Sequence, residues 1–343
     1  MIFIASRTIY KLQKNKAVNL HFENINSHNM KLQTEQLLGT LEVLKEHLYK
    51  TFFWDASVQG EFNIWNLIKF ERLIEPVTPE AAIEKWIQEE QMHHISSSDE
   101  YGGDDPEPDK FLDDATKLFR EKKYQSLLNL LKSNLEHIEA FKFQFPGYSK
   151  DYDWLDEYSH KDFICGLIGK TFDGDWIAIS PTIPTRQTLC EQISYSNYKF
   201  PTSPTIGENI SNLESNVEQI LAELTPLKLA LCYAAGYSYD YIYQLCCAVS
   251  QTKESAITQS LLKSGLLRIK QFNGFLSNYS THLYEDVDRK RQQILVRFFK
   301  EKLSDIRIYH LALYDIDYTY ILGETPDKDC LGIKMSGSYE YNP

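Results

Sequence analysis

The sequence predicts an α/β protein built as two tandem modules, each closed by an antiparallel β-hairpin. Apolar residues recur at every second position from Ile316 to Leu322, which indicates a half-buried strand. Turn-forming residues at Pro326–Asp329 and a return strand at 330–333 complete a hairpin. The same hairpin pattern occurs earlier, where 163–166 matches 320–323 and 173–179 matches 327–333.

The internal repeat extends upstream of both hairpins. Residues 130–141 align with 298–309 without a gap, and Thr78–Ile83 matches Thr252–Ile257. Because the matched blocks keep one order and similar spacing, they indicate a tandem duplication of a module of about 150 residues, an ordinary domain size.

The expected organisation divides the chain of 343 residues into four parts. These are a disordered tail or over-predicted start at 1–30, a first module at 31–185, a linker at 186–205 and a second module at 206–343. No secretory cleavage site follows the short apolar start, and Met30 directly precedes the first well-patterned helix. Prolines on both sides of the module boundary favour the linker: Pro181, Pro184, Pro201 and Pro204.

In the first module, an apolar stripe predicts a helix at 33–50, formed by Leu37, Leu38, Leu41, Leu44 and Leu48. A turn-rich loop is expected at 52–61 and a strand at 62–70. Pro79 at the first helical position predicts a helix that begins at Thr78.

The polar stretch 89–114 predicts a mobile acidic loop. The module then continues with a long helix or two abutting helices at 109–140, a strand at 140–145, a polar loop at 146–161 and the hairpin. The second module repeats this order, with helices near 209–224, 253–264 and 285–304, a loop at 233–238, and strands at 239–249, 266–272 and the closing hairpin.

The charge is concentrated in the first module. Residues 31–185 carry 16 basic and 29 acidic groups, a net charge of −13, whereas residues 186–343 carry −2. An acidic module disfavours direct binding to nucleic acid or to an anionic membrane, and suits a basic protein partner. The alternative is that the acidic surface only promotes solubility.

The six cysteines form no CxxC pair and lie mostly in apolar runs, which favours reduced, buried thiols and a cytoplasmic protein. No apolar run approaches the roughly 18 residues that a membrane span needs.

Candidate metal sites are weak. Asp105, Glu107 and Asp109 suggest a calcium loop, but the turn glycine and the bidentate acid at the proper offset are missing. The adjacent His93 and His94 are typical of a solvated pair. We expect no metal and no cofactor.

Catalytic motifs are also missing, since no GxGxxG, Walker A, HExxH or GxSxG sequence occurs. A hydrolase that uses Cys165 with His160 is the least favoured alternative, because Cys165 aligns with Leu322 in the other hairpin and so suits a packing position. The sequence favours a binding protein, not an enzyme.

The C-terminal block resembles the nuclease A inhibitor-like family. The resemblance lies in 298–303, in the Gly-Glu-Thr-Pro turn that begins at Gly323, and in Leu331–Ile333. It extends upstream through 284–286, 272–275 and 237–241, and covers nearly all of 210–336. The first module, over 35–182, is similar to a more divergent member.

This resemblance implies an α/β/α sandwich in each module. It also implies inhibition of a sugar-non-specific, magnesium-dependent endonuclease by blocking its active site. Such a nuclease is basic where it holds phosphate, so an acidic inhibitor suits it. The alternative is an interaction or immunity-type module that uses the same scaffold for another target.

The resemblance implies that acids in the loop before the first strand, and an Asp-Trp pair before the Tyr-Glu-Asp run, contact the enzyme. These positions are altered in the second module, where the loop acids fall on Ala234 and Gly236 and the Asp-Trp pair on His282 and Leu283. In the first module, Asp55 and Glu61 occupy the equivalent loop. We therefore expect Asp55 and Glu61 to make the principal contact, helped by the acidic run. The full set of expected partner-binding residues is Asp55, Glu61, Asp104, Asp105, Glu107, Asp109, Tyr237, Tyr284, Glu285 and Asp286. For the last three, the start of a helix is an equal alternative.

Overall fold

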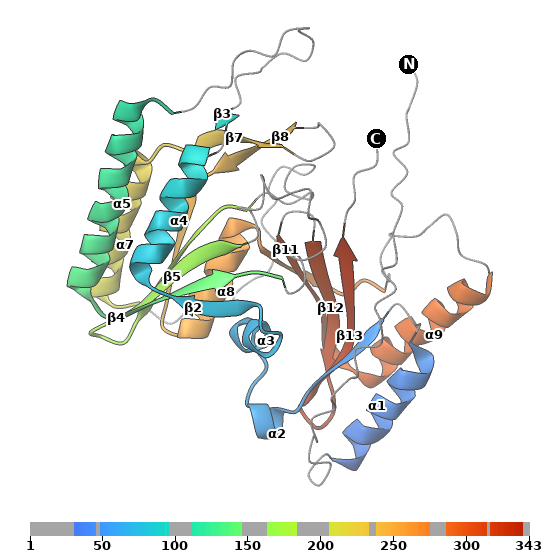
Figure 1. Ribbon diagram of the computed structural model, residues 1–343. Coiled ribbons are helices and arrows are strands. Elements are labelled where there is room, and N and C mark those ends of the chain that lie inside the picture. The colour runs from blue at the N-terminus through green and yellow to red at the C-terminus, as the bar shows by residue number, and fades with distance from the viewer. Residues whose placement is uncertain are drawn as a thin grey trace, which may run out of the picture. The chain divides into compact units, whose positions relative to one another are not determined.

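The chain forms two compact units, each drawn from separate stretches of sequence (Figure 1). Unit 1 combines Met1–Phe62, Arg268–Leu311 and Ile316–Pro343, and unit 2 combines Asn63–Leu267 and Ala312–Asp315. The computed structural model describes residues 31–45, 49–92, 94–95, 112–145, 163–183, 206–232, 238–274, 286–313 and 316–338. The expected tail at 1–30 and the whole of the expected linker at 186–205 lie outside these ranges.

Unit 1 contains a five-stranded sheet in the order β1-β13-β12-β11-β10. Its strands are β1 (Lys50–Trp54), β10 (Leu267–Gln271), β11 (Ser304–Leu313), β12 (Ile316–Glu324) and β13 (Cys330–Ser338). Strands β12 and β13 pair antiparallel from Ile316↔Ser338 to Glu324↔Cys330, which confirms the predicted hairpin. The other edge of β13 pairs antiparallel with β1, a strand from the N-terminal half of the chain.

Two helices, α1 (Leu32–Leu44) and α9 (Asp286–Lys302), cover one face of this sheet (Figure 1). The core between them and the sheet is aliphatic and aromatic, with Leu41, Leu295, Phe299, Ile321 and Ile333 almost fully buried. The predicted helix at 33–50 is therefore present but shorter, because the chain is already in β1 at Lys50.

The other face of the unit 1 sheet carries aromatic side chains. Because side chains alternate along a strand, Phe52 and Tyr320 lie opposite the helix-facing Phe53 and Ile321. The rings of Phe52 and Tyr320 are 5.6 Å apart in an edge-to-face arrangement, and Phe52 makes a similar contact with Phe62. Such pairs stabilise a fold beyond the area that they bury.

Unit 2 contains a five-stranded sheet in the order β2-β4-β5-β6-β9 and a three-stranded sheet in the order β3-β7-β8. The larger sheet is formed by β2 (Ile74–Val77), β4 (Leu135–Phe143), β5 (Ile164–Thr171), β6 (Trp176–Pro181) and β9 (Leu245–Ser250). The smaller sheet is formed by β3 (His94–Ile95), β7 (Leu227–Cys232) and β8 (Ser238–Tyr243). Strands β5 and β6 form the predicted first hairpin, and β6 also pairs antiparallel with β9.

Helices lie on both faces of the larger sheet in unit 2 (Figure 1). On one face, α4 (Pro79–Met92), α5 (Asp114–Asn134) and α7 (Glu208–Glu223) share a core with Ile177 and Ile179 of β6. On the other face, α8 (Lys253–Ser264) approaches β6 so that the hydroxyls of Ser180 and Ser260 are 2.7 Å apart. Unit 2 is thus a three-layer α/β/α arrangement.

The expected pair of self-contained tandem sandwich modules is not confirmed. Strand β1 comes from the first half of the chain but joins the sheet of β10–β13, and β9 comes from the second half but joins the sheet of β2–β6. Each five-stranded sheet therefore contains one edge strand from the other half of the sequence.

Two local predictions in the first half are wrong. Residues 62–70, expected as a strand, contain the helix α3 (Ile64–Phe70), because the Asn63 side chain caps its start and the apolar residues have helical spacing. The expected loop at 52–61 contains the end of β1 and the short helix α2 (Ala56–Gln59).

The expected helical stretch at 109–140 corresponds to α5, which ends at Asn134, and β4 follows immediately at Leu135. The predicted helices at Thr78, 209–224, 253–264 and 285–304 are present as α4, α7, α8 and α9.

Candidate functional site

A short loop and a hairpin turn lie together in unit 1 and contain the two acids that the sequence favours. We call them the α2–turn surface, defined as residues 55–61 and 324–329. The backbone N–H of Ala56 donates to Asp329 Oδ1 at 3.0 Å, which joins the loop after β1 to the turn before β13.

Asp55 organises the loop because its carboxylate caps α2. Oδ1 accepts from the backbone N–H groups of Ser57 and Val58, at 2.9 and 3.2 Å, and from the Ser57 hydroxyl at 2.6 Å. Gly60 then closes the loop at a φ of 78°, a left-handed conformation that favours glycine. Its carbonyl accepts from Trp54 Nε1 at 2.8 Å. The loop is therefore held at both ends.

Buried polar side chains fix the turn. Asp329 and Thr325 are almost fully buried, and the Thr34 hydroxyl of α1 donates to Asp329 Oδ2 at 3.0 Å. The backbone N–H of Thr325 donates to the Asp329 carbonyl, and the Asp329 N–H donates to the Thr325 hydroxyl. These hydrogen bonds explain why threonine and aspartate stand at these turn positions.

Asp327 caps the start of α1 from a distant part of the chain. Lys31 occupies the N-cap position without a side-chain cap of its own. Instead, Asp327 Oδ2 accepts from the Thr34 backbone N–H at 3.2 Å. It also lies 3.0 Å from the Thr34 hydroxyl, whose single hydrogen it shares with Asp329. A carboxylate here satisfies an otherwise unpaired donor of the helix and complements the helix dipole.

The exposed part of the α2–turn surface is acidic with one apolar residue at its tip. Glu61 is exposed, Asp55 is half-buried, and Val58 is 73% exposed. Glu324 pairs with Lys328 across the turn at 2.6 Å. A rigid loop that presents carboxylates around an apolar tip can bind a basic protein surface, and it contains no group arranged for covalent chemistry.

The β5–β6 turn of unit 2 has the same backbone hydrogen bonds as the turn at 324–329 in unit 1. The Thr171 N–H donates to the Asp175 carbonyl at 2.8 Å, as Thr325 does to Asp329. Asp175 Oδ2 accepts from the backbone N–H of Gly207, the N-cap of α7, at 2.9 Å. Each turn thus holds the start of a helix that comes from the other half of the sequence.

The other expected contact residues are only partly placed. Residues Asp104, Asp105, Glu107, Asp109, Tyr237, Tyr284 and Glu285 lie outside the described residues. Asp286 is the first residue of α9, in agreement with the helix-start interpretation. Asp55 and Glu61 lie in one loop of unit 1, whereas the acidic run belongs to the sequence of unit 2.

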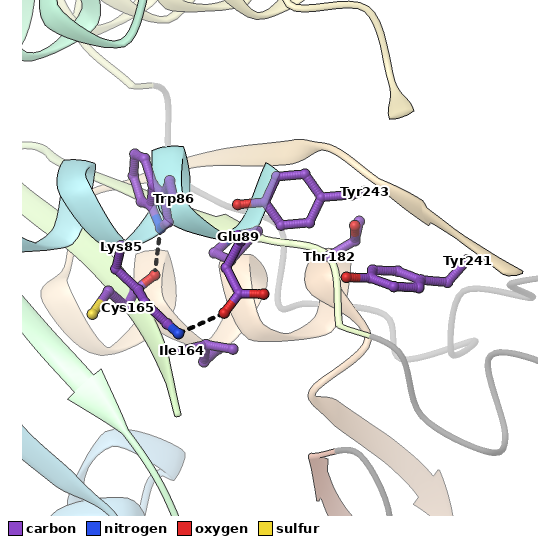
Figure 2. A pocket seen from close by; sticks show the side chains of 9 residues that line it. Lys85, Trp86, Glu89, Ile164, Cys165, Thr182, Tyr241 and Tyr243 are labelled. Atoms are coloured by element: carbon purple, nitrogen blue, oxygen red, sulfur yellow. Dashed lines mark hydrogen bonds and ion pairs between the residues drawn. The ribbon is translucent and has the colours of Figure 1, made fainter. Parts of the chain in front are cut away.

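A second polar site lies in unit 2, around the buried ion pair of Lys85 and Glu89 (Figure 2). Lys85 Nζ and Glu89 Oε1 are 2.6 Å apart, and the side chains of Tyr241 and Tyr243 point toward this pair. The Tyr243 hydroxyl is buried and has no hydrogen-bond partner among the described residues. The cavity of about 10 Å³ admits at most one water molecule, so it does not suit a substrate.

Cys165 lines this cavity but is a poor nucleophile. Burial raises the pKa of its thiol to about 11, so the thiol stays protonated at neutral pH. Its carbonyl accepts from Trp86 Nε1 at 2.9 Å, which is a packing contact (Figure 2). His160, the proposed base, lies outside the described residues.

A buried ionic triad in unit 2 is a feature that the sequence did not reveal. Arg120 donates through Nε and Nη2 to the two carboxylate oxygens of Glu90, at 2.7 and 2.6 Å, and Tyr124 donates to the same carboxylate. Burial, followed by the charge of Glu90, raises the pKa of Tyr124 well above its usual value. Nothing in the helical patterns of α4 and α5 distinguishes these side chains from solvated ones.

No helix in the described part of the chain has the length and apolar character to cross a membrane. Within the same residues, no cluster of three or more His, Cys, Asp or Glu side chains could hold a metal ion. His93, Asp105, Glu107 and Asp109 lie outside the described residues, and so does the side chain of His94.

Comparison with known families gives a match in the second half of the chain. Residues 219–336 match the family described as nuclease A inhibitor-like protein. A search of curated protein sequences found no match to the chain. The matched segment includes the turn at 324–329, the half of the α2–turn surface that anchors the loop. The family is consistent with a protein that binds another protein and is not an enzyme.

Proposed function

We propose that the protein inhibits a basic, sugar-non-specific endonuclease by placing the α2–turn surface over the active site of the enzyme. The family match over 219–336 carries this proposal, because an inhibitor-type function requires a protein partner. Asp55 and Glu61 supply the contact, and the turn at 324–329 supplies the support.

Preorganisation of the loop favours this function. The cap made by Asp55 and the bond from Ala56 to Asp329 fix the loop before any partner arrives. A loop that is already ordered loses less conformational entropy on binding, so more of the contact energy appears as affinity. The exposed Val58 between the acids suits the centre of such a contact.

Charge supports the same partner class. The chain carries a net charge of −12, whereas a nuclease must be basic where it binds phosphate. We propose that the acids at 104–109 act on the association rate, since charges at the rim of an interface mostly steer diffusion. Neutralising Asp104, Asp105, Glu107 and Asp109 should then slow association at low salt and matter little at high salt.

The test separates the charge of Asp55 from its capping role. Degradation of plasmid DNA by a sugar-non-specific, magnesium-dependent endonuclease is measured with increasing amounts of the full chain. Asp55→Asn keeps a good helix cap but removes the charge, whereas Asp55→Ala removes both. A carboxylate buried against an arginine or a metal costs about 2–5 kcal/mol when it is lost, so both variants should inhibit at least about 30-fold more weakly.

Glu61→Gln should also weaken inhibition, whereas Glu121→Gln, an exposed acid on α5 in unit 2, is the matched control and should change nothing. Equal inhibition by the wild type and Asp55→Asn, with loss only in Asp55→Ala, would show that the loop acts by shape and not by charge. If the full chain fails to inhibit at stoichiometric excess, the inhibitory function is wrong, and the alternative of an interaction module for another target is favoured.

A further inference from the structure

Strand β9 is the outer strand of the larger sheet in unit 2, and among the described residues only one of its edges is paired. Its inner edge pairs with β6 from Trp176↔Ser250 to Pro181↔Leu245. The backbone N–H of Gln244 donates to the Thr182 hydroxyl, and the Gln244 carbonyl accepts from the Thr182 N–H. The backbone N–H and C=O groups of Gln244 therefore point inward, toward the β6 side.

Alternation along the strand then determines which backbone groups face outward. In an antiparallel ladder, successive residues direct their N–H and C=O groups to opposite edges. With Gln244 inward, the outward residues are Leu245, Cys247 and Val249. Lys263 Nζ donates to the Cys247 carbonyl at 2.6 Å, which agrees with this assignment. The N–H groups of these three residues have no partner among the described residues.

In β8, the strand directly before β9 in the sequence, the backbone groups on this outer edge are paired with β7. Strand β7 pairs with β8 up to Leu227↔Tyr243 and stops there. Pro226 precedes Leu227, and proline has no N–H with which to continue the ladder. Before Pro226 the chain is in α7 and not in a strand, so the outer edge of β9 continues that edge of β8 with no partner strand among the described residues.

A groove of about 710 Å³ runs beside this edge. It is lined by Leu221 and Glu218 of α7, by Leu262 and Lys263 of α8, and by Leu245 and Cys247 of the edge itself. The two helices lie on opposite faces of the sheet, so the edge lies between them. Burial raises the thiol pKa of Cys246 to about 11 and of Cys247 to about 12, which makes these cysteines packing groups.

We propose that this groove binds an extended peptide segment of a partner protein, which adds to the sheet as a strand beside β9. Extended backbone is the chemistry that unpaired N–H groups at strand spacing recognise. Leucines from both helices offer contacts to the apolar side chains of such a peptide.

Charge favours a basic peptide on the α7 side of the groove, where Glu218 lies. The two cations that line the groove are already held, Arg120 by Glu90 and Lys263 by the Cys247 carbonyl. Glu214 and Glu218 are one helical turn apart on α7, and Glu218 is at the groove. Burial, followed by the charge of Glu218, raises the pKa of Glu214, whereas Lys263 acts in the opposite direction. A lysine on the α7 side of the peptide would relieve this repulsion. A second copy of the chain suits the edge less well, because two-fold pairing of β9 would bring the acids of α7 against their own copies.

The probe is a capped hexapeptide of alternating lysine and valine, added to the full chain. Amide hydrogen exchange is followed at single-residue resolution. In the free protein, the amides of Cys247 and Val249 should exchange at least tenfold faster than those of Cys246 and Ala248, which face β6. Saturating peptide should slow Cys247 and Val249 by tenfold or more. Two further peptides carry N-methyl groups, one on the lysine amides and the other on the valine amides. Because only alternate amides face β9, one of these peptides should lose the protection and the other should keep it.

Two variants test the edge itself. Val249→Pro removes one outward N–H without touching the β6 ladder and should weaken peptide binding at least tenfold. Val249→Thr is its matched control, since it keeps both the N–H and the branched shape, and should bind like the wild type. If Val249→Pro does not fold, Glu214→Gln with Glu218→Gln provides the second test, with an expected loss of about fivefold.

Three results would overturn the proposal. The first is slow exchange at Cys247 and Val249 in the free protein, which would mean that another segment of the chain already covers the edge. The second is wild-type peptide binding by a folded Val249→Pro variant. The third is equal binding of a peptide in which glutamate replaces lysine. None of these measurements uses a nuclease, so they are independent of the proposed inhibition.

Discussion

The backbone N–H of Ala56 donates to Asp329 across 273 positions of sequence. This bond joins α2, which follows a strand of the N-terminal half, to the turn of the C-terminal hairpin. The other oxygen of the same carboxylate accepts from Thr34 of α1. One buried aspartate therefore anchors two elements of the first half to the sheet of the second half.

Asp329→Ala should destabilise unit 1 by about 1–3 kcal/mol. The substitution leaves the N–H of Ala56 without its acceptor, at about 1–3 kcal/mol for an unsatisfied buried group, whereas the hydroxyl of Thr34 keeps Asp327 as an acceptor. Urea unfolding followed by far-UV circular dichroism, compared with the wild type, measures the loss. Asp329→Asn keeps one acceptor oxygen and should lose less. A change below about 0.5 kcal/mol for the alanine variant would contradict the anchoring role.

Arg120→Met should destabilise unit 2 by about 3–5 kcal/mol, because Glu90 would remain buried without its cation. Joint replacement of Arg120 and Glu90 by methionine should recover most of this loss, since the unpaired charge is gone. The free energies of unfolding of the two single variants and the double variant give the coupling. Additive losses would show that the ion pair does not account for the effect.

The buried thiols should react slowly at pH 8. Burial raises the pKa of Cys165 to about 11 and that of Cys330 to about 12, so few thiolates form. Iodoacetamide labelling, followed by peptide mass mapping, should be slow in the native protein and fast in urea. Labelling of native Cys165 as fast as in urea would contradict this burial.

The same shifts fix the sign of the stability change with pH. A native thiol with a raised pKa stays protonated while the unfolded thiol ionises. Stability should therefore be full below about pH 9 and fall as the pH rises toward 11–12. Replacing Cys165 by alanine should reduce this alkaline loss, although it also leaves a cavity.

The half-chains 31–185 and 206–343 should fold together but not alone. Separation removes β1 and α1 from the sheet of β10–β13, and removes β9 and α7 from the sheet of β2–β6. Each half would then expose an unpaired strand edge, a known cause of aggregation. Co-expression should give a soluble complex that elutes at the size of the intact chain. A soluble, cooperatively unfolding half on its own would instead support independent tandem modules.

Local patterns in the sequence predicted much of the secondary structure. The start of α4 followed from Pro79, and both hairpins followed from alternation around turn residues. Each of these signals lies within a few residues of the structure that it predicts. The strand expected at 62–70 failed because an apolar run can suit either element, and the cap at Asn63 decides for a helix.

Partner choice between strands could not be predicted in this way. The local sequence of Phe52–Trp54 suits a loop and an edge strand equally well. Only its pairing with Leu331 and the neighbours of Leu331 makes it a strand. The candidate site shares this limit. The resemblance to the family suggested Asp55 and Glu61 as candidates, but the support of their loop by Asp329 depends on a contact between distant segments.

The exchange of edge strands between the two halves also sets a condition on synthesis. Lys50 pairs with Lys334, so β1 leaves the ribosome about 280 residues before its partner exists. At about 5–20 residues per second, that interval lasts roughly 15–60 s. Throughout this time the nascent N-terminal segment has a strand edge and an apolar helix face without their native cover. Translation rate and chaperone supply should therefore affect the yield of this protein more than they affect that of a chain whose domains fold one after another.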